Sequence, residues 1–360
     1  MLLQRACLER YRARVPRIII FGAGAIGCWI GGRLAVGGAD VVLVGRPRVL
    51  GELERGLQIS ELGGGQWTVH PELATEVPAT HDGDVILVCT KSAQTPDAAR
   101  ALAATRGAII SMQNGVRNPD VLRAGLPGRA VLAGMVPFNV VRRGPGSYHR
   151  GSGGSLTVEN RDAAAPLTEA CLRADVRLEL RDDMLAVQWA KLVMNLNNAI
   201  NALSGIPLAA ELAHRGYRRI LADAQREALD LLRAARINVA RVTLVPPRWM
   251  PRLLALSDPL FRRLAGRVVA IDPYARSSMW DDLEAKRPTE IDYINGEVVA
   301  LAERLGTRAP VNAGLVALVR AAEQGGKRDF SAEALRHALQ SMTEKPPAIA
   351  PTSNASRNLP

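Results

Sequence analysis

The chain has 360 residues, enough to bury a large core and, at ordinary domain sizes, to form two domains. Hydrophobic residues make up 48% and charged residues 22%, a composition typical of globular proteins and not of disordered or fibrous ones. The formal charge of +11 favours anionic ligands. The basic residues are spread along the chain, however, and aromatic residues are only 4%, which argues against binding of nucleic acid.

The sequence also argues against a metal centre, a membrane protein and a secreted protein. The four cysteines are far apart and form no Cys-x-x-Cys pair, which predicts a reducing compartment and no bound metal. No apolar run reaches the roughly 18 residues of a membrane span, so we expect no membrane contact and a cytoplasmic location. Residues 1–16 are rich in arginine and lack the apolar core of a secretory signal. We interpret them as a basic N-terminal extension, with an amphipathic transit peptide as the alternative.

A strand, a glycine-rich turn and a helix follow this extension. The apolar run 18–21 predicts a buried parallel strand, a helix is expected over 25–36, and a second strand follows at 41–44. The turn between them has the pattern Gly-x-Gly-x-x-Gly. This order predicts a Rossmann dinucleotide-binding site in which helix N–H groups face the pyrophosphate; a glycine turn with a structural role only is the alternative. The predicted cofactor-binding residues of the turn are Gly22, Ala23, Gly24, Ala25, Ile26 and Gly27.

The residue that follows the second strand indicates which dinucleotide binds. In an NAD site that strand ends in Asp or Glu, which accepts a hydrogen bond from the adenine ribose. Here the strand is followed by Gly45 and Arg46. A guanidinium group cannot accept such a bond, but its planar fork suits a 2′-phosphate. The sequence therefore predicts NADPH/NADP as the cofactor, with a solvated loop arginine as the alternative.

Two later strands, at 84–90 and 108–111, deliver polar side chains to one edge of the predicted sheet. Because open α/β sheets bind ligands at the carboxyl ends of their strands, we predict that Lys91 and Gln94 contact the cofactor. Asn114 is expected to reach the nicotinamide ribose or the substrate. The alternatives are a surface lysine and a turn-forming asparagine before a glycine.

The rest of the sequence divides into a strand-rich part and a helical part. A β-hairpin is predicted over 57–69, and from residue 184 onward the apolar residues recur at helical spacing. We therefore predict an α/β protein with a Rossmann-type doubly wound sheet followed by an all-helical domain. Further strands are predicted at 130–137, 148–150 and 155–159, all antiparallel, and at 176–180. The predicted divisions are a 1–16 extension, a 17–181 NADP-binding domain, a 182–343 substrate and catalytic domain with a Pro-interrupted lid or spacer at 240–273, and a disordered tail at 344–360.

One stretch of the helical part has more polar groups than packing requires. Lys191, Asn195 and Asn198 fall at i, i+4 and i+7, on one face of a predicted helix. An ammonium with two amides can hold a substrate carbonyl and carboxylate, and a lysine desolvated in a cleft has a lowered pKa that suits a proton donor. The alternative is that the amides join helices while Lys191 extends to water.

A carboxylate later in the chain is the second candidate. Thr289, after Pro288, is the predicted N-cap of a helix, which would place Glu290 in its first turn. The functional interpretation is a carboxylate facing the cleft, paired with Lys191 or with a substrate hydroxyl. The alternative is that Glu290 complements the helix dipole and nothing more.

Over residues 17–322 the order of these motifs resembles the ketopantoate reductase (2-dehydropantoate 2-reductase) family. That family combines a Rossmann domain with a helical domain resembling that of 6-phosphogluconate dehydrogenases. The segments that carry the resemblance are Gly-Ala-Gly-Ala-Ile-Gly from Gly22, Lys91-x-x-Gln94, Asn114-Gly115, Trp-x-Lys191-Leu-x-x-Asn195, Ser278-Met-x-x-Asp282 and Thr289-Glu290-Ile291.

The resemblance implies a role for each of these residues. By this resemblance Lys191 is the general acid that protonates the ketone oxygen, and Glu290 holds the substrate hydroxyl. It further implies the following contacts: Asn195 and Ser278 with the substrate, Lys91 and Asn114 with cofactor and substrate, and Arg46 with NADPH. Many members of the family place a second asparagine eight residues after the lysine, where this chain has Ala199. Asn198 or Asn201 would substitute for it.

The implied activity is NADPH-dependent reduction of 2-dehydropantoate, or a similar branched 2-keto acid, to the 2-hydroxy acid, as in pantothenate and coenzyme A biosynthesis. The partner would be a small anionic 2-keto acid, and the oligomeric state stays open, with a homodimer among the alternatives. A β-hydroxyacid dehydrogenase-like NADP oxidoreductase is the rival enzyme, against which the segment 278–290 argues. A non-catalytic NADPH-binding sensor is the rival of another class.

Overall fold

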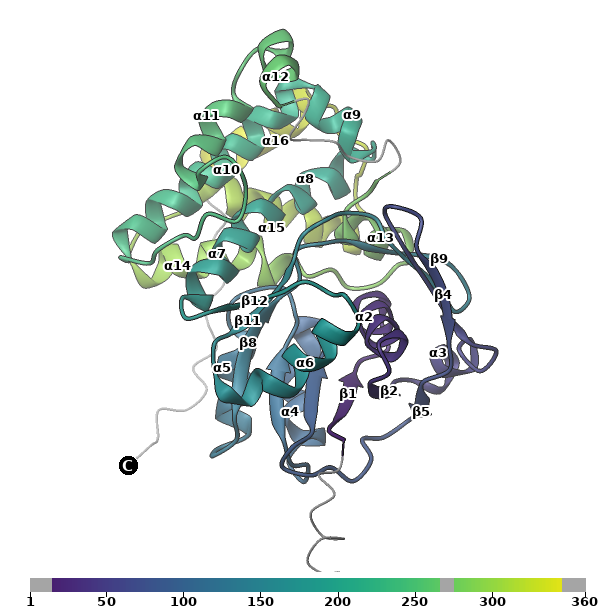
Figure 1. The fold of residues 1–360 in the computed structure, drawn as a ribbon. Helices are drawn as coiled ribbons and strands as arrows, with labels where there is room; N and C mark the ends of the chain where they lie inside the picture. Colours follow the sequence, from purple (N-terminus) through teal and green to yellow (C-terminus); the bar gives the residue numbers. More distant parts are fainter. Residues whose placement is uncertain (1–14, 266–274, 345–360) are drawn as a thin grey trace, which may run out of the picture.

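The protein has an α/β half followed by a half made of helices (Figure 1). The computed structural model describes residues 15–265 and 275–344. The predicted fold class is confirmed. Most of the predicted 1–16 extension, nearly all of the predicted 344–360 tail and part of the segment 240–273 lie outside the described residues. Within the described ranges, every helix is too short or too polar to cross a membrane.

The α/β half is built on an eight-stranded sheet in the order β12-β11-β8-β7-β6-β1-β2-β5. The six strands from β5 to β8 are parallel to their neighbours and have the strand order of a dinucleotide-binding sheet. Two more strands extend one edge: β11 is antiparallel to β8, and β12 is parallel to β11. The strands are β1 (Arg17–Phe21), β2 (Asp40–Val44), β5 (Glu72–Ala74), β6 (Val85–Val88), β7 (Ala108–Ser111), β8 (Val131–Met135), β11 (Leu156–Glu159) and β12 (Leu178–Arg181).

Helices cover both faces of this sheet because its central strands are apolar on both sides. In β1, Ile18 and Ile20 pack in the core under α2 (Ala25–Val36) and α6 (Ala165–Arg173), whereas Ile19 points to the opposite face. The side chains of a strand alternate between its two faces, so a continuous apolar run marks a strand buried on both. The opposite face is covered by α4 (Thr95–Ala101) and α5 (Asn118–Gly125).

A second sheet of four strands, in the order β4-β3-β10-β9, packs on the outer side of α2 (Figure 1). Helix α2 is therefore enclosed between two sheets, which explains why apolar residues surround it. Trp29, on α2, reaches this sheet and donates its Nε1–H to the carbonyl of Ser60 at 3.0 Å. The strands are β3 (Leu57–Glu61), β4 (Gln66–Val69), β9 (Val140–Gly144) and β10 (Ser147–Arg150).

The predicted hairpin of β3 and β4 is confirmed as an antiparallel pair. The prediction that β8, β10 and β11 are antiparallel is right on one side of each strand and wrong on the other. Strand β11 is antiparallel to β8 and β10 to β9, but β8 pairs in parallel with β7, β10 with β3 and β11 with β12. Strand propensity says nothing about direction, which depends on where the connecting segments cross the sheet. Strands β5 and β9, which are short or polar, were not predicted.

The helical half is organised around the 20-residue helix α10 (Arg215–Ala234), which packs against most of its neighbours. Its buried side chains join those of α7, α8, α13, α14, α15 and α16 in one apolar core. This half lies over the carboxyl ends of the parallel strands (Figure 1), so that polar groups from both halves meet there. The other helices are α7 (Met184–Asn195), α8 (Asn197–Ser204), α9 (Leu208–Ala213), α11 (Met250–Leu254), α12 (Asp258–Ala265), α13 (Ser278–Glu284), α14 (Asn295–Arg304), α15 (Pro310–Glu323) and α16 (Ala332–Glu344).

The contact between α2 and β1 yields a stability prediction. A Cβ added at Gly27 would lie 2.2 Å from the Gly22 carbonyl oxygen and 2.8 Å from the Ile20 side chain. We expect Gly27→Ala to lower the free energy of unfolding by about 1–3 kcal/mol, since a backbone oxygen cannot move aside cheaply. Gly24→Ala is the matched control: its Cβ would meet nothing within 4 Å, and its cost should stay below about 1 kcal/mol. Urea unfolding of both variants measures the difference, and equal losses would contradict this packing.

Candidate active site

The glycine-rich turn has the geometry of an anion-binding loop. Gly22 has a φ of +116°, which favours glycine, and its N–H donates to the carbonyl of Val44 at 3.0 Å. Gly24 precedes the first residue of α2 and has open space around it. No side chain caps this helix, so the N–H groups of its first turn are available to an anionic ligand. The turn therefore fits a pyrophosphate group.

Arg46 and Gln94 follow β2 and β6, the two strands that flank β1. Arg46 immediately precedes the short helix α3 (Pro47–Gly51), and its side chain is exposed. Within residues 15–265 and 275–344, neither Arg46 nor Arg48 forms an ion pair, so both guanidinium groups can face a ligand. Gln94 is exposed at the end of the 3₁₀ turn η1 (Ser92–Gln94).

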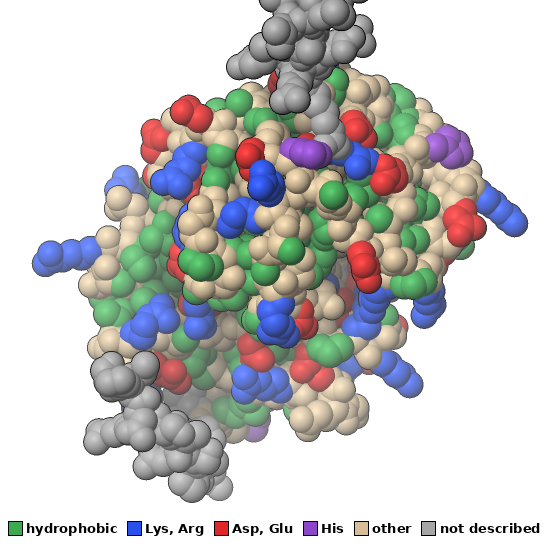
Figure 2. All heavy atoms as spheres, turned by 90° about the horizontal axis from the view of Figure 1, so that it is seen from below, with side chains coloured by type: hydrophobic (Ala, Val, Ile, Leu, Met, Phe, Trp, Pro, Cys, Tyr) green, Lys and Arg blue, Asp and Glu red, His purple; other side chains and the backbone are tan. Residues whose placement is uncertain are grey.

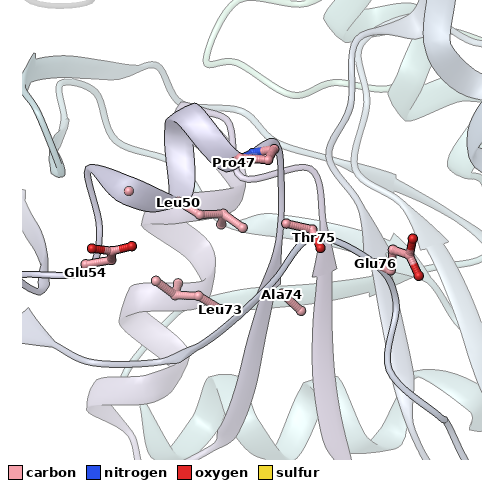
Figure 3. Close-up of a pocket in the computed structure, with 8 residues that line it drawn as sticks. Pro47, Leu50, Glu54, Leu73, Ala74, Thr75 and Glu76 are labelled. Atoms are coloured by element: carbon pink, nitrogen blue, oxygen red, sulfur yellow. The ribbon is translucent and has the colours of Figure 1, made fainter.

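A surface hollow of about 580 Å³ lies beside Arg46, between α3 and the end of β5 (Figure 3). Leu50 and Leu73 form apolar parts of its lining, and the carboxylates of Glu54 and Glu76 lie at its sides (Figure 3). Its lining includes none of the residues predicted to bind cofactor or substrate. The chemistry suggested by the sequence lies elsewhere, at the contact between the two halves.

That contact is centred on Glu290, whose side chain is buried. One carboxylate oxygen, Oε1, accepts from the backbone N–H of Ser92 at 3.1 Å and from its hydroxyl at 2.9 Å. The other, Oε2, accepts from the Asn114 side-chain amide at 3.1 Å and lies 3.5 Å from the ammonium of Lys91. Lys91 lies closer to a second buried carboxylate, at 2.7 Å from Asp282 Oδ2. A carboxylate from the helical half is thus seated on the strand ends of the α/β half.

The charges in this cluster stabilise one another. Burial opposes the charge of Lys91, but the carboxylates of Glu290 and Asp282 outweigh burial and raise the pKa of Lys91. Burial would likewise raise the pKa of Glu290. The charge of Lys91 and the donors of Ser92 and Asn114 outweigh it and hold the pKa of Glu290 below its usual range. Both groups are therefore ionised at neutral pH.

The predicted position of Glu290 in the first turn of a helix is wrong. Glu290 precedes the 3₁₀ turn η4 (Ile291–Tyr293), and α14 begins five residues after Glu290. Thr289 Oγ1 does accept a hydrogen bond, from the N–H of Ile291 at 3.2 Å. The carboxylate of Glu290 accepts hydrogen bonds from Ser92 and Asn114 and does not cap the backbone N–H groups of its own segment. Its ammonium partner in the described structure is Lys91, and the pairing with Lys191 is not formed.

Lys191 lies on α7, where its ammonium is 3.3 Å from the carbonyl oxygen of Pro137, just beyond β8. The side chain is half-buried, and desolvation lowers the pKa of Lys191 to about 8. Within the described ranges no carboxylate forms an ion pair with it. The group is mostly charged at neutral pH, yet it gives up its proton more readily than an ordinary lysine.

Asn195 continues the line from Lys191 towards Glu290. Its side-chain Nδ2 lies 3.5 Å from Asn114 Oδ1, and Asn114 in turn donates to Glu290. The predicted helix that carries Lys191, Asn195 and Asn198 on one face is interrupted in the structure. Helix α7 ends at Asn195 and α8 begins at Asn197, because the helix is interrupted at Leu196, within a run of asparagines that are poor helix formers.

Helix α8, which carries Asn198, packs against α13, which carries Ser278. Neither side chain bonds to the cluster around Glu290. Asn198 is half-buried, and its backbone carbonyl accepts from the Ser277 hydroxyl at 3.2 Å. Ser278 is exposed at the first position of α13. In the described part of the chain, neither side chain has a hydrogen-bond partner. Both are therefore free to meet a ligand.

Three residues of this contact were not predicted: Ser92, Asp282 and Arg117. Ser92 directly follows Lys91 at the strand edge, and Asp282 lies inside the quoted segment 278–282, so both had a signal in the sequence. Arg117 forms an ion pair with the buried Glu297 of the helical half. Nothing in its local sequence indicates that partner, because the two are 180 positions apart.

Two further observations concern metal ions and nucleic acid. In residues 15–265 and 275–344, no group of three or more His, Cys, Asp or Glu side chains is placed to hold a metal ion. On the face of the molecule seen in Figure 2, Lys and Arg side chains are interspersed with Asp and Glu, and the described atoms form no continuous basic stripe. That face lacks the charge pattern that a nucleic acid needs.

Comparison with known proteins decides the family. Residues 18–163 match the family described as "Ketopantoate reductase PanE/ApbA", and residues 183–323 match its C-terminal region, "Ketopantoate reductase PanE/ApbA C terminal". A 2-dehydropantoate 2-reductase from Archaeoglobus fulgidus is 31% identical over 328 residues, which span 87% of this chain and 99% of that protein. The chain belongs to the ketopantoate reductase family.

Solved structures agree with this membership. A ketopantoate reductase of the same family from Ralstonia eutropha matches with a TM-score of 0.72 at 29% identity, covering 86% of this chain and 99% of that one. A D-mandelate dehydrogenase in a ternary structure with NADH and anilino(oxo)acetate matches with a TM-score of 0.71 at 21% identity, over 86% and 99%. At that identity the second likeness shows the fold alone. Both solved structures cover the two halves of this chain.

The seating of Glu290 predicts a pH dependence of stability. Its pKa is lower in the folded chain than in the unfolded chain, so the charged group stabilises the fold above pH about 4.3 and this contribution is lost as the pH falls. We expect the free energy of unfolding of Glu290→Gln to fall less than that of the unchanged protein between pH 7 and pH 3, a range that extends below the usual pKa of a glutamate. Urea unfolding at both values measures it.

The matched control is Glu303→Gln, a change of an exposed glutamate in the same half. It should keep the full acid sensitivity of the unchanged protein. Identical sensitivity in Glu290→Gln and Glu303→Gln would show that the contact of Glu290 with Lys91 and Ser92 contributes nothing.

Proposed function

We propose that this protein uses NADPH to reduce 2-dehydropantoate, or a closely similar branched 2-keto acid, to the 2-hydroxy acid. The observation that carries the proposal is the pair of groups at the contact between the halves. One is a half-buried ammonium, Lys191, whose pKa is lowered to about 8 by burial, and the other is the ionised, buried carboxylate of Glu290. Curated relatives named 2-dehydropantoate 2-reductase, at 28 and 31% identity over most of the chain, support the same reaction.

Three features fit a nicotinamide dinucleotide. The turn from Gly22 to Gly27 and the uncapped start of α2 suit its pyrophosphate. Arg46, exposed directly after β2, suits the 2′-phosphate that distinguishes NADPH from NADH. Lys91 and Gln94 would contact the cofactor from the end of β6. When bound, the reduced nicotinamide supplies the hydride that is added to the carbonyl carbon of the substrate.

The residues of the chain would supply the proton and the orientation. Lys191 would donate the proton from Nζ to the ketone oxygen, which needs an acid that is charged yet not strongly basic. Glu290 would accept a hydrogen bond from the substrate hydroxyl. Asn195 contacts Asn114, which donates to Glu290, and both amides would hold the substrate.

Asn198 and Ser278 complete the proposed substrate site. Asn198 is the substitute for the asparagine that the family often has at position 199, because its side-chain amide is unbonded in the described structure. We further propose the division into an NADP-binding domain at 17–181 and a substrate domain at 182–343. In this arrangement each domain contributes groups to one site.

The test is oxidation of NADPH, followed at 340 nm, across a panel of 2-keto acids and of 3-hydroxy acids in the reverse direction. We expect 2-dehydropantoate to give the highest kcat/KM, and Lys191→Met to lower kcat at least about 100-fold while NADPH binding stays within twofold. Below pH about 8 Lys191 holds its proton, so kcat for reduction should fall as the pH rises through that value. Turnover of 3-hydroxy acids alone, or full activity of Lys191→Met, would refute the assignment.

The choice of cofactor is tested at Arg46. Arg46→Asp removes the group that fits the 2′-phosphate and places a carboxylate there, which can accept from a ribose hydroxyl instead. We expect KM for NADPH to rise at least about tenfold while KM for NADH falls or stays the same. The exposed Arg55→Asp, on the same half, is the control and should leave both values unchanged. An unaltered NADPH preference in Arg46→Asp would contradict the 2′-phosphate assignment.

A further inference from the structure

A buried polar cluster joins α8, α9 and α13 just behind the proposed substrate site. Asn201, on α8, is fully buried and uses its whole side-chain amide. Its Nδ2 group donates to the carbonyl of Ile206 at 3.0 Å and to Glu211 Oε2 at 2.7 Å. Its Oδ1 accepts from the backbone N–H of Ser277 at 2.9 Å. Asn201 therefore has no free group for a substrate, which excludes it as the substitute for the family's second asparagine.

Ile206, Glu211 and Ser277 together fix which way round the Asn201 amide sits. An amide can be reversed, exchanging its oxygen and nitrogen, unless its partners distinguish donor from acceptor. Ile206 offers only a carbonyl oxygen and Glu211 an acceptor oxygen, so both require the Nδ2 side of Asn201. This leaves Oδ1 facing Ser277. Glu211 is itself fully buried on α9, and the side chain of Asn197 on α8 is a second hydrogen-bonding neighbour of its carboxyl group.

Ser277 is the N-cap of α13 and is held from three directions. Its N–H is bound by Asn201, its hydroxyl donates to the carbonyl of Asn198 at 3.2 Å, and the same hydroxyl accepts from the N–H of Trp280 at 3.2 Å. An N-cap fixes both the start of a helix and the direction in which its first residues point. The next residue is Ser278, the first of α13, whose side chain is exposed.

We propose that Glu211 and Asn201 act as positioning residues, which hold the N-cap Ser277 and thereby place Ser278 against the substrate. This inference rests on the proposed function, because it assumes that Ser278 contacts the substrate. A fully buried acid is costly unless its polar atoms are bonded, and the hydrogen bond of Glu211 to Asn201 is the contact that the positioning role requires. Burial raises the pKa of Glu211 to about 8, so at neutral pH it is mostly a neutral acid with the acceptor that Asn201 requires.

The first experiment separates positioning from stability by steady-state kinetics. Asn201→Leu keeps the branched shape and the number of side-chain heavy atoms and removes all three hydrogen bonds. We expect its KM for 2-dehydropantoate to rise about tenfold, with KM for NADPH unchanged within twofold. The control is Asn312→Leu, which removes a buried asparagine bonded to Glu227 and Ala224 of α10, away from α13. It should lower the melting temperature but leave both KM values within twofold.

Two further comparisons test the route of the effect. If Asn201 acts through Ser278, the double variant Asn201→Leu/Ser278→Ala should have the KM of Ser278→Ala alone, because the two losses are not additive. Glu211→Leu should reproduce Asn201→Leu, and Glu211→Gln, which keeps an acceptor oxygen, should restore KM to within threefold of the unchanged protein. Additive losses, or equal effects of Gln and Leu at position 211, would overturn the proposal.

A readout independent of activity keeps the two proposals apart. Amide hydrogen exchange over residues 277–281 should become at least about tenfold faster in Asn201→Leu, and exchange in the other helices should stay unchanged. If the protein reduces no 2-keto acid but exchange over residues 277–281 becomes faster, the proposed function fails. The role of Asn201 in holding Ser277 then still stands. Unchanged exchange at 277–281, or a uniform rise throughout the helical half, would refute the positioning role of Asn201.

Discussion

The site depends on one interaction. The buried carboxylate of Glu290, from the helical half, accepts hydrogen bonds from residues at the strand ends of the α/β half. Glu290 receives two donors from Ser92, one from Asn114 and the nearby charge of Lys91, all from segments that follow β6 and β7. A buried carboxylate without such partners would cost several kcal/mol, so the contact is stable only when both halves are in register. The contact of Glu290 with the strand ends also fixes where the helical half, and Lys191 with it, lies relative to them.

The sheet makes this contact because of how its apolar residues are distributed. Buried parallel strands require helices on both faces, which leaves the carboxyl-end loops as the exposed polar edge. Helix α2 lies against β1 at Gly27, with its uncapped first turn at the same edge. The helical half then covers this edge, so that Glu290 and Asp282 of that half meet Lys91, Ser92 and Asn114 at the strand ends.

Much of this could be predicted because the signals are local. The strand, glycine turn and helix around Gly22 depend on neighbouring residues, and the strand-end positions of Lys91 and Asn114 follow from parallel pairing. What could not be predicted depends on distant partners. Glu290 was expected at a helix start because Thr289 is a good cap, yet its partners lie 176 to 199 positions away. The interruption at Leu196 was likewise hidden, because helical spacing does not show where a helix breaks.

The central proposal is that Lys191 and Glu290 both contact the 2-hydroxyl group that forms when the ketone oxygen of the substrate is protonated. It is tested most directly by a crystal structure of the protein with NADP⁺ and pantoate bound. The account predicts that the 2-hydroxyl oxygen of pantoate lies within about 3.2 Å of both Lys191 Nζ and a Glu290 carboxylate oxygen. A complex in which Lys191 Nζ stays on the carbonyl of Pro137 and pantoate binds beyond its reach would contradict the account.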